Sequence, residues 1–243
     1  MLQKIIRNSV FHLASFIYND DDSKILFYHD IHKQKTYCDF STSIETFLLH
    51  IDTIRQSKFS IVNSINQRNH QVCIQFDDGY KGIADCINYL VEYQIPIEVF
   101  VITDNIGKTN FLDKEDMQRL LATGFVKFSS HTHTHKKLSN CDTNTIVDEL
   151  VRSKRILEDI CKTDIDSICY PYGLFSAQVI ECCESLGFTH QYSSLPGSYH
   201  HLFKDKVRRR NLIQFASKSE LNSVLKGAHN ILNHTYIKRH FKI

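Results

Sequence analysis

The chain has 243 residues, of which 42% are hydrophobic and 23% are charged, a composition typical of one globular domain. Its formal net charge of +2 is too small for the strongly basic face that general nucleic-acid binding requires, so we expect no nucleic-acid partner. No apolar stretch reaches the length of a transmembrane helix.

Residues 1–21 are expected to form an N-terminal extension, and residues 22–243 a single domain. Apolar residues recur in the extension at helical spacing and predict an amphipathic helix: Leu2, Ile5, Ile6, Val10, Leu13 and Ile17. We expect its apolar face to pack on the domain, with peripheral contact to a membrane surface as the alternative. The extension lacks the apolar core and small-residue cleavage site of a signal peptide.

Strand and helix patterns alternate along the rest of the chain. Strands are expected over residues 26–31, 72–76, 97–103, 125–129, 166–170, 188–192 and 206–213, and helices over residues 83–93, 114–122, 143–161 and 176–186. Asp142 is a candidate N-cap, and Gly124 and Gly187 are candidate helix ends. Such repeated strand–helix units predict a parallel sheet with right-handed crossovers.

Two adjacent carboxylates, Asp77 and Asp78, follow the expected strand over residues 72–76. Catalytic groups in α/β folds lie at strand ends of this kind. Because neighbouring carboxylates repel each other, a metal ion would compensate their charge, with one Asp as its ligand and the other free to act as a base. An ordinary Asp-Gly turn after a strand is the alternative.

Three histidines, His131, His133 and His135, follow the expected strand over residues 125–129. In a helix or tight turn His131 and His135 share a face, whereas in an extended segment all three point the same way. Either geometry can hold a metal, and a polar surface loop is the alternative. A third strand ends in the turn Pro171-Tyr172-Gly173, which sequence alone does not distinguish from an ordinary turn.

These three segments, in this order, resemble the polysaccharide deacetylase family, also called the NodB-homology or carbohydrate esterase family 4 fold. The family motifs are Thr-Phe-Asp-Asp-Gly, His-Ser/Thr-x-x-His and Arg-x-Pro-Tyr-Gly, which correspond here to residues 75–79, 131–135 and 169–173. The resemblance covers about residues 22–215. It implies a single-domain α/β fold, an irregular (β/α) barrel that is TIM-like but distorted, with about seven units.

The resemblance also implies roles for matching residues. Asp77 would be the general base, and the backbone N–H of Tyr172 would help to form the oxyanion hole. Asp78, His131 and His135 would bind a divalent metal, in most members Zn²⁺. His133 falls at a variable position of its motif and is not assigned to the metal.

One motif residue departs from the family, because the Arg that orients the base is Cys169 here. A subgroup that resembles poly-N-acetylglucosamine deacetylases also tends to lack this Arg, and it begins with a Tyr-His strand, here Tyr28-His29. His29 is therefore the candidate general acid, with a strand-end histidine without a role as the alternative.

The expected strand over residues 206–213 contains three arginines, and alternation places Arg208 and Arg210 on one face and Arg209 on the other. Arg210 aligns best with an Arg that the subgroup often carries. We expect it to support the site or to bind an anionic part of the substrate; a solvated basic strand edge is the alternative.

The implied reaction is metal-dependent removal of N-acetyl groups from an amino-sugar glycan or glycoconjugate, so the expected partner is an N-acetylated amino-sugar substrate. Two alternatives are a cytoplasmic deformylase or deacylase of a lipid- or nucleotide-linked sugar, and a non-catalytic carbohydrate-binding relative with a degenerate site. The eight cysteines have no paired-ligand spacing and lie mostly in apolar segments, which indicates free thiols in a reducing cytoplasm. No sequence feature indicates an oligomeric state.

Overall fold

A curled sheet of parallel strands forms the centre of the protein in a computed structural model. The structure describes residues 2–242, and for residues 2–8 it describes the backbone alone. The strand order is β11-β10-β8-β7-β6-β5-β1-β12, and β4 pairs with β5 beside this path. The strands are β1 (Lys24–Tyr28), β4 (Ser60–Ile61), β5 (Gln71–Phe76), β6 (Ile97–Val101), β7 (Val126–Ser130), β8 (Ser167–Cys169), β10 (His190–Tyr192), β11 (Val207–Arg208) and β12 (Asn211–Leu212). Every pairing in this sheet is parallel.

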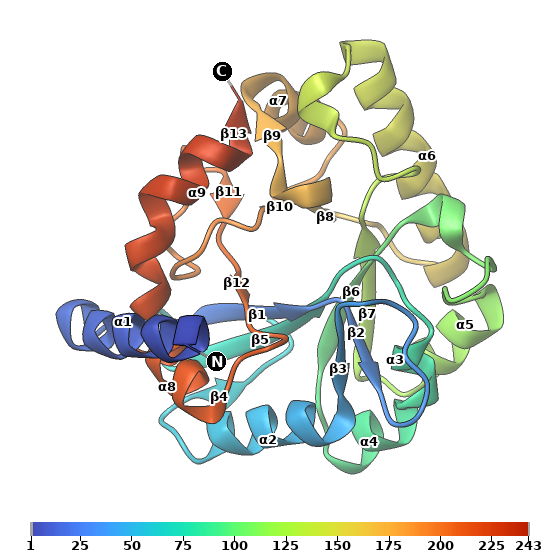
Figure 1. The fold of residues 1–243 in the computed structure, drawn as a ribbon. Helices are drawn as coiled ribbons and strands as arrows, with labels where there is room; N and C mark the ends of the chain where they lie inside the picture. Colours follow the sequence, from blue (N-terminus) through green and yellow to red (C-terminus); the bar gives the residue numbers. More distant parts are fainter. Residues whose placement is uncertain (1, 243) are drawn as a thin grey trace.

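Helices cover the outside of the sheet, so the described chain forms the distorted barrel that the sequence predicts (Figure 1). The α-helices are α1 (Leu2–Tyr18), α2 (Ile44–Arg55), α3 (Gly82–Asp85), α4 (Ile87–Glu92), α5 (Lys114–Ala122), α6 (Thr143–Cys161), α7 (Ala177–Ser185), α8 (Lys218–Leu225) and α9 (Asn233–His240). The 3-10 turns are η1 (Thr103–Asn105), η2 (Leu138–Asn140), η3 (Pro171–Gly173) and η4 (Ala228–Leu232). Two small ribbons pair β2 (Asp30–His32) with β3 (Ser41–Ser43), and β9 (Phe175–Ser176) with β13 (Phe241–Lys242).

The local signals explain where several helices begin and end. The side chain of Asp142 accepts a hydrogen bond from the Thr145 backbone N–H and caps α6, as expected. Gly124, with φ of 73°, follows α5 and takes the left-handed conformation that ends many helices. The expected helix over residues 83–93 is instead broken at Cys86 into α3 and α4. Apolar spacing places Val91 on one face with Ile83 and Leu90, but Val91 is exposed whereas the other two are buried.

Alternation along the strands gives the protein two apolar layers. Leu26 and Ile74 belong to a large cluster that includes residues of the surrounding helices. Their strand neighbours Ile25 and Cys73 belong to a smaller cluster with Phe100, Cys169 and Tyr192, contributed by β6, β8 and β10. Because successive side chains of a strand point to opposite faces, the smaller cluster fills the inside of the barrel.

The N-terminal helix is confirmed as α1, but the prediction of its buried face is wrong. Phe11, Ala14 and Ser15 are the buried residues, and α1 packs against α8 and η4. Val10, Leu13 and Ile17 are 42%, 63% and 69% exposed. The side chains of Leu2, Ile5 and Ile6 lie outside the described part of the structure. Within that part, no helix is long and apolar enough to cross a membrane.

Candidate active site

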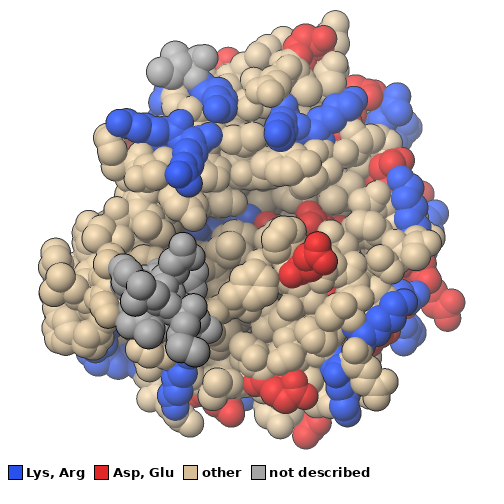
Figure 2. Space-filling view, viewed as in Figure 1, with Lys and Arg blue, Asp and Glu red and all other residues tan. Residues whose placement is uncertain are grey.

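The residues singled out by the sequence motifs meet at one end of the barrel. Asp77 and Asp78 follow β5, His131 follows β7, and the η3 turn follows β8. His29 follows β1, and Arg210 lies between β11 and β12. All of the predicted site residues line one cleft of about 920 Å³. The corresponding face is hollowed near its middle in the space-filling view (Figure 2).

Asp78, His131 and His135 form a compact group of metal-ligand type. The Asp78 Oδ1 atom lies 3.4 Å from Nε2 of His131 and 3.6 Å from Nε2 of His135, and the three donor atoms lie within 4.8 Å of one another. Two imidazoles and one carboxylate, with positions left open, form the ligand set of many catalytic zinc sites. The donor chemistry therefore fits a divalent metal.

The hydrogen bonds around this group turn its donor atoms towards one another. His131 Nδ1 lies 2.8 Å from the backbone oxygen of Cys169, and because a carbonyl oxygen only accepts, Nδ1 carries a proton and Nε2 faces Asp78. Burial acts to lower the pKa of His131, but Cys169, Asp78 and Asp77 more than offset it and hold this pKa well above its usual range. Burial, together with the nearby His131, lowers the pKa of His135 to about 4, so its imidazole is neutral at neutral pH. His133 points elsewhere and pairs with Thr103 Oγ1 at 2.9 Å, which agrees with leaving it unassigned.

Four of the eleven described non-glycine residues with a positive φ lie in or beside this group. Asp78, Thr132, His135 and Tyr172 have φ of 72°, 67°, 61° and 59°, in the left-handed region that non-glycine residues seldom adopt. The conformation of Asp78 turns its carboxylate towards the two histidines, while the carboxylate of Asp77 faces Arg210. The two neighbouring carboxylates are thus separated, and each is compensated by a different partner.

Asp77 is held by a buried bidentate ion pair with Arg210. Nη1 and Nη2 of the fully buried arginine lie 2.7 and 2.8 Å from the two carboxylate oxygens. The guanidinium also lies 4.2 Å from the centre of the Phe27 ring, and its Nε donates to the Ser193 backbone oxygen. Burial acts to raise the pKa of Asp77, but Arg210 more than offsets it, so the net pKa lies well below the usual range.

Arg210 thus supplies a cation beside Asp77, which Cys169 cannot supply. The single strand expected over residues 206–213 is two short strands, β11 and β12, which lie at opposite edges of the sheet. Arg210 lies in the connection between them and is not part of a solvated strand edge. Arg208, on β11, instead lies over the Tyr199 ring.

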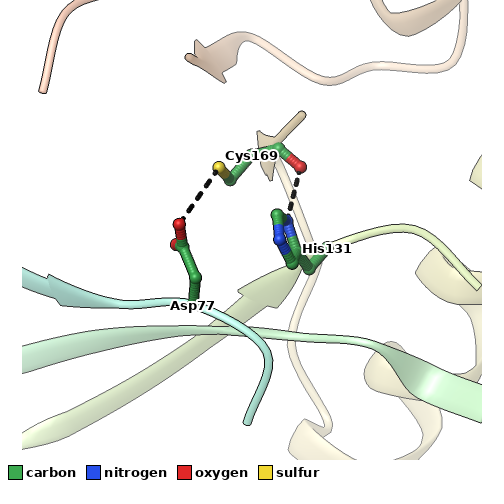
Figure 3. A group of neighbouring side chains, drawn as sticks. All are labelled: Asp77, His131 and Cys169. Carbon is green, nitrogen blue, oxygen red and sulfur yellow. Dashed lines mark hydrogen bonds between the residues drawn. The ribbon is translucent and has the colours of Figure 1, made fainter. Parts of the chain in front are cut away.

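Cys169 contacts both Asp77 and His131: its thiol lies against the Asp77 carboxylate, and its backbone oxygen bonds to the His131 ring (Figure 3). Its thiol accepts a hydrogen bond from Arg210 Nη2 at 2.8 Å and lies 3.9 Å from Asp77 Oδ2. Asp77, His131 and Cys169 are also close enough to share an ion, but both Asp77 oxygens are engaged by Arg210. Burial moreover raises the pKa of the Cys169 thiol, which disfavours the thiolate that a metal would need. We therefore assign the metal site to Asp78, His131 and His135.

His29 has a partner that the sequence did not suggest. Its Nδ1 lies 2.7 Å from Oε1 of the buried Gln214, so Nδ1 carries a proton and the ring is held in one orientation. Gln214 lies 185 residues away along the chain and two residues beyond β12, in no motif. The parallel pairing of β1 with β12 brings the two residues together.

The η3 turn presents Tyr172 at the cleft. Its side chain is 55% exposed, and its ring lies 4.6 Å from that of His135. Among the described residues, no hydrogen-bond acceptor faces the backbone N–H of Tyr172. Gly173 allows close packing behind the turn, because a Cβ there would lie 2.7 Å from Ser194 Oγ and 2.8 Å from His240 Cδ2.

Comparison with known proteins agrees with this geometry. A family model described as polysaccharide deacetylase matches residues 64–190, just over half of the chain. A poly-β-1,6-N-acetyl-D-glucosamine N-deacetylase of Staphylococcus aureus is 29% identical over 136 residues, which are 50% of this chain and 47% of that protein. The chain therefore spans about half the length of such relatives.

Solved structures with the same fold support the barrel assignment. A deacetylase of Streptococcus pyogenes superposes with a TM-score of 0.73 at 18% identity, covering 84% of this chain and 98% of the other. The IcaB protein of Ammonifex degensii gives a TM-score of 0.75 at 18% identity, covering 86% and 99%. At this level of identity the likeness establishes the fold.

Proposed function

The chain belongs to the polysaccharide deacetylase family, and from that premise we propose that it is a metal-dependent hydrolase that removes N-acetyl groups from an amino-sugar glycan or glycoconjugate. The observation that carries the proposal is the separation of two adjacent carboxylates. Asp78 faces two histidines, and Asp77 is held by Arg210. A sugar-binding module has no need of both arrangements in one cleft. The name of the Staphylococcus aureus relative supports an N-acetylglucosamine polymer as the substrate class.

Asp78, His131 and His135 would hold the metal, for which the donor set favours Zn²⁺. When bound, the metal supplies Lewis-acid polarisation of the acyl carbonyl and lowers the pKa of water. The orientation of His131 is fixed by the Cys169 backbone oxygen, so metal affinity depends on β8 as well as on the ligands.

Asp77 would act as the base that accepts a proton from the attacking water. Arg210 keeps the carboxylate ionised and fixes both of its oxygens, so the base is positioned before the substrate arrives. The backbone N–H of Tyr172 would donate to the oxyanion of the tetrahedral intermediate, a contribution of about 3 kcal/mol for donors of this kind.

His29 would act as the acid. Because Gln214 accepts from Nδ1, the remaining nitrogen, Nε2, is the atom available in the cleft. In its protonated form it would donate to the departing amine of the sugar. Gln214 is then a positioning residue, which sets the orientation of the ring without contacting the substrate.

We also propose that the chain works in a reducing compartment, the cytoplasm. All eight cysteines are free thiols, including the neighbours Cys182 and Cys183. Burial raises the pKa of Cys73 and of Cys86 to about 12, which keeps these thiols protonated and unreactive.

The test is a deacylation screen on metal-replete protein. Acetylated amino-sugar oligomers, lipid-linked amino sugars and nucleotide-linked amino sugars are compared by release of acetate or formate and by the appearance of free amine. The proposal expects acetate from the oligomers, released at least about 100-fold more slowly by the Asp77→Asn variant. Formate from a lipid- or nucleotide-linked sugar would favour the deformylase alternative, and metal binding without any release would favour a non-catalytic relative.

A further inference from the structure

The N-terminal helix carries a second apolar face that the fold leaves uncovered. Five of the thirteen large apolar side chains that are exposed in the described structure fall between Val10 and Tyr18. Val10, Leu13, Phe16 and Ile17 recur at helical spacing and form one stripe, 42–69% exposed. This stripe, here called the α1 stripe, is larger than the scattered exposed residues usual on a surface.

The α1 stripe is held in place from its opposite side. Phe11 and Ala14 are buried, and Phe11 packs edge-on against the His229 ring of η4 at 4.9 Å between ring centres. Because these contacts fix the rotation of α1 about its own axis, the helix cannot turn the stripe inward without losing the contacts of Phe11 and Ala14. The apolar stripe is therefore a fixed feature of the outer surface.

A basic hollow borders the α1 stripe. It lies between α1 and α8, and it is lined by His12, Ser15, Phe16, Lys218, Asn222 and Lys226, among others, with no carboxylate in its lining. Lys218 and Lys226 are exposed, and neither forms an ion pair with a described residue. Residues 9–18, the part of α1 whose side chains the structure describes, contain no Lys, Arg, Asp or Glu.

We propose that the α1 stripe and the basic hollow dock the protein on the surface of a lipid bilayer that contains anionic headgroups. Helices that lie in a membrane interface combine one apolar face with adjacent lysines, and the lysines contact anionic lipid. Phe16 belongs to both the stripe and the hollow, so apolar and charged contacts are made together. Val10 belongs to the stripe and to the cleft lining, so docking places the cleft beside the bilayer surface.

Vesicle sedimentation of the full chain tests the proposal. Vesicles of phosphatidylcholine are compared with vesicles of phosphatidylcholine mixed with phosphatidylglycerol. We expect binding to the mixed vesicles, weakened about tenfold or more by the double change Leu13→Ser and Phe16→Ser. Lys218→Gln and Lys226→Gln should each weaken it about fivefold, and added salt should weaken it too.

Matched controls distinguish docking through the α1 stripe from nonspecific adsorption to vesicles. Val91→Ser and Val151→Ser remove apolar side chains from α4 and α6 that are 44% and 42% exposed, close to the 42% of Val10. Lys162→Gln removes a charge beyond α6, and none of these changes should alter binding. The unfolding midpoint of each variant confirms that it is folded. The proposal is overturned if the wild type does not sediment with mixed vesicles or if the stripe variants bind as well as it does. A dimer in light scattering that these variants dissociate, without vesicle binding, would assign the stripe to a second copy instead.

Discussion

Replacing Arg210 by methionine should destabilise the protein strongly, because it leaves the Asp77 carboxylate buried without its counter-charge. Arg210 is fully buried, Asp77 is 4% exposed, and the pair is joined at 2.7 and 2.8 Å. Breaking one partner of such a pair costs about 3–5 kcal/mol, whereas replacing both partners by neutral groups costs far less. The double variant Asp77→Asn with Arg210→Met should therefore be less destabilised than the sum of the single variants, by about 1–3 kcal/mol.

Urea unfolding followed by circular dichroism gives the free energy of unfolding of the wild type, the two single variants and the double variant. A chelator is present so that metal binding does not contribute. Arg209→Met is the matched control. Arg209 is 7% exposed, and it donates to the backbone oxygens of His201 and Pro196 and to the Asn233 side chain, none of them charged. Its effect should add to that of Asp77→Asn within about 0.5 kcal/mol. The ion pair does not hold the base if Arg210→Met lowers the free energy of unfolding by less than about 1 kcal/mol. The same conclusion follows if the effects of Arg210→Met and Asp77→Asn add as closely as those of Arg209→Met and Asp77→Asn.

Three further outcomes are expected. Asp78→Ala and His135→Ala should each lose the bound metal in elemental analysis, and full retention would place the ligands elsewhere. Gly173→Ala should lower the free energy of unfolding by more than about 1 kcal/mol, since φ of 68° and three contacts below 3 Å oppose a Cβ. Burial lowers the pKa of His50, so the unfolded chain takes up a proton at this residue more readily than the folded protein does. The free energy of unfolding should therefore fall as the pH drops through about 6.5, the pKa of an unfolded histidine. The His50→Asn variant should show a smaller fall when unfolding is measured as a function of pH.

The sequence predicted the parts of the site that depend on local chain geometry. Asp77, Asp78, His131 and His135 follow strands, and parallel strand ends meet at one rim of a barrel. α5 and α6 begin and end where their caps and apolar spacing indicated. These features are encoded within a few residues of the positions they determine.

The rest depends on contacts between distant segments. Arg210 reaches Asp77 across 133 residues, and Gln214 reaches His29 across 185, and no spacing rule connects either pair. Periodicity indicated that α1 is amphipathic, but both of its sides carry apolar residues, so the pattern could not decide which side α8 and η4 would cover. The strand over residues 206–213 divides because β11 and β12 pair with opposite edges of the sheet.

The most direct test of the proposed chemistry measures bound metal and acetate release on the same preparations of the wild type and Asp77→Asn. The two proteins should hold equal metal, because Asp77 faces Arg210 rather than the group formed by Asp78, His131 and His135. The wild type should release acetate from N-acetylglucosamine oligomers, and the variant should do so at least about 100-fold more slowly, as expected for loss of a general base. Equal rates at equal metal content would contradict the account.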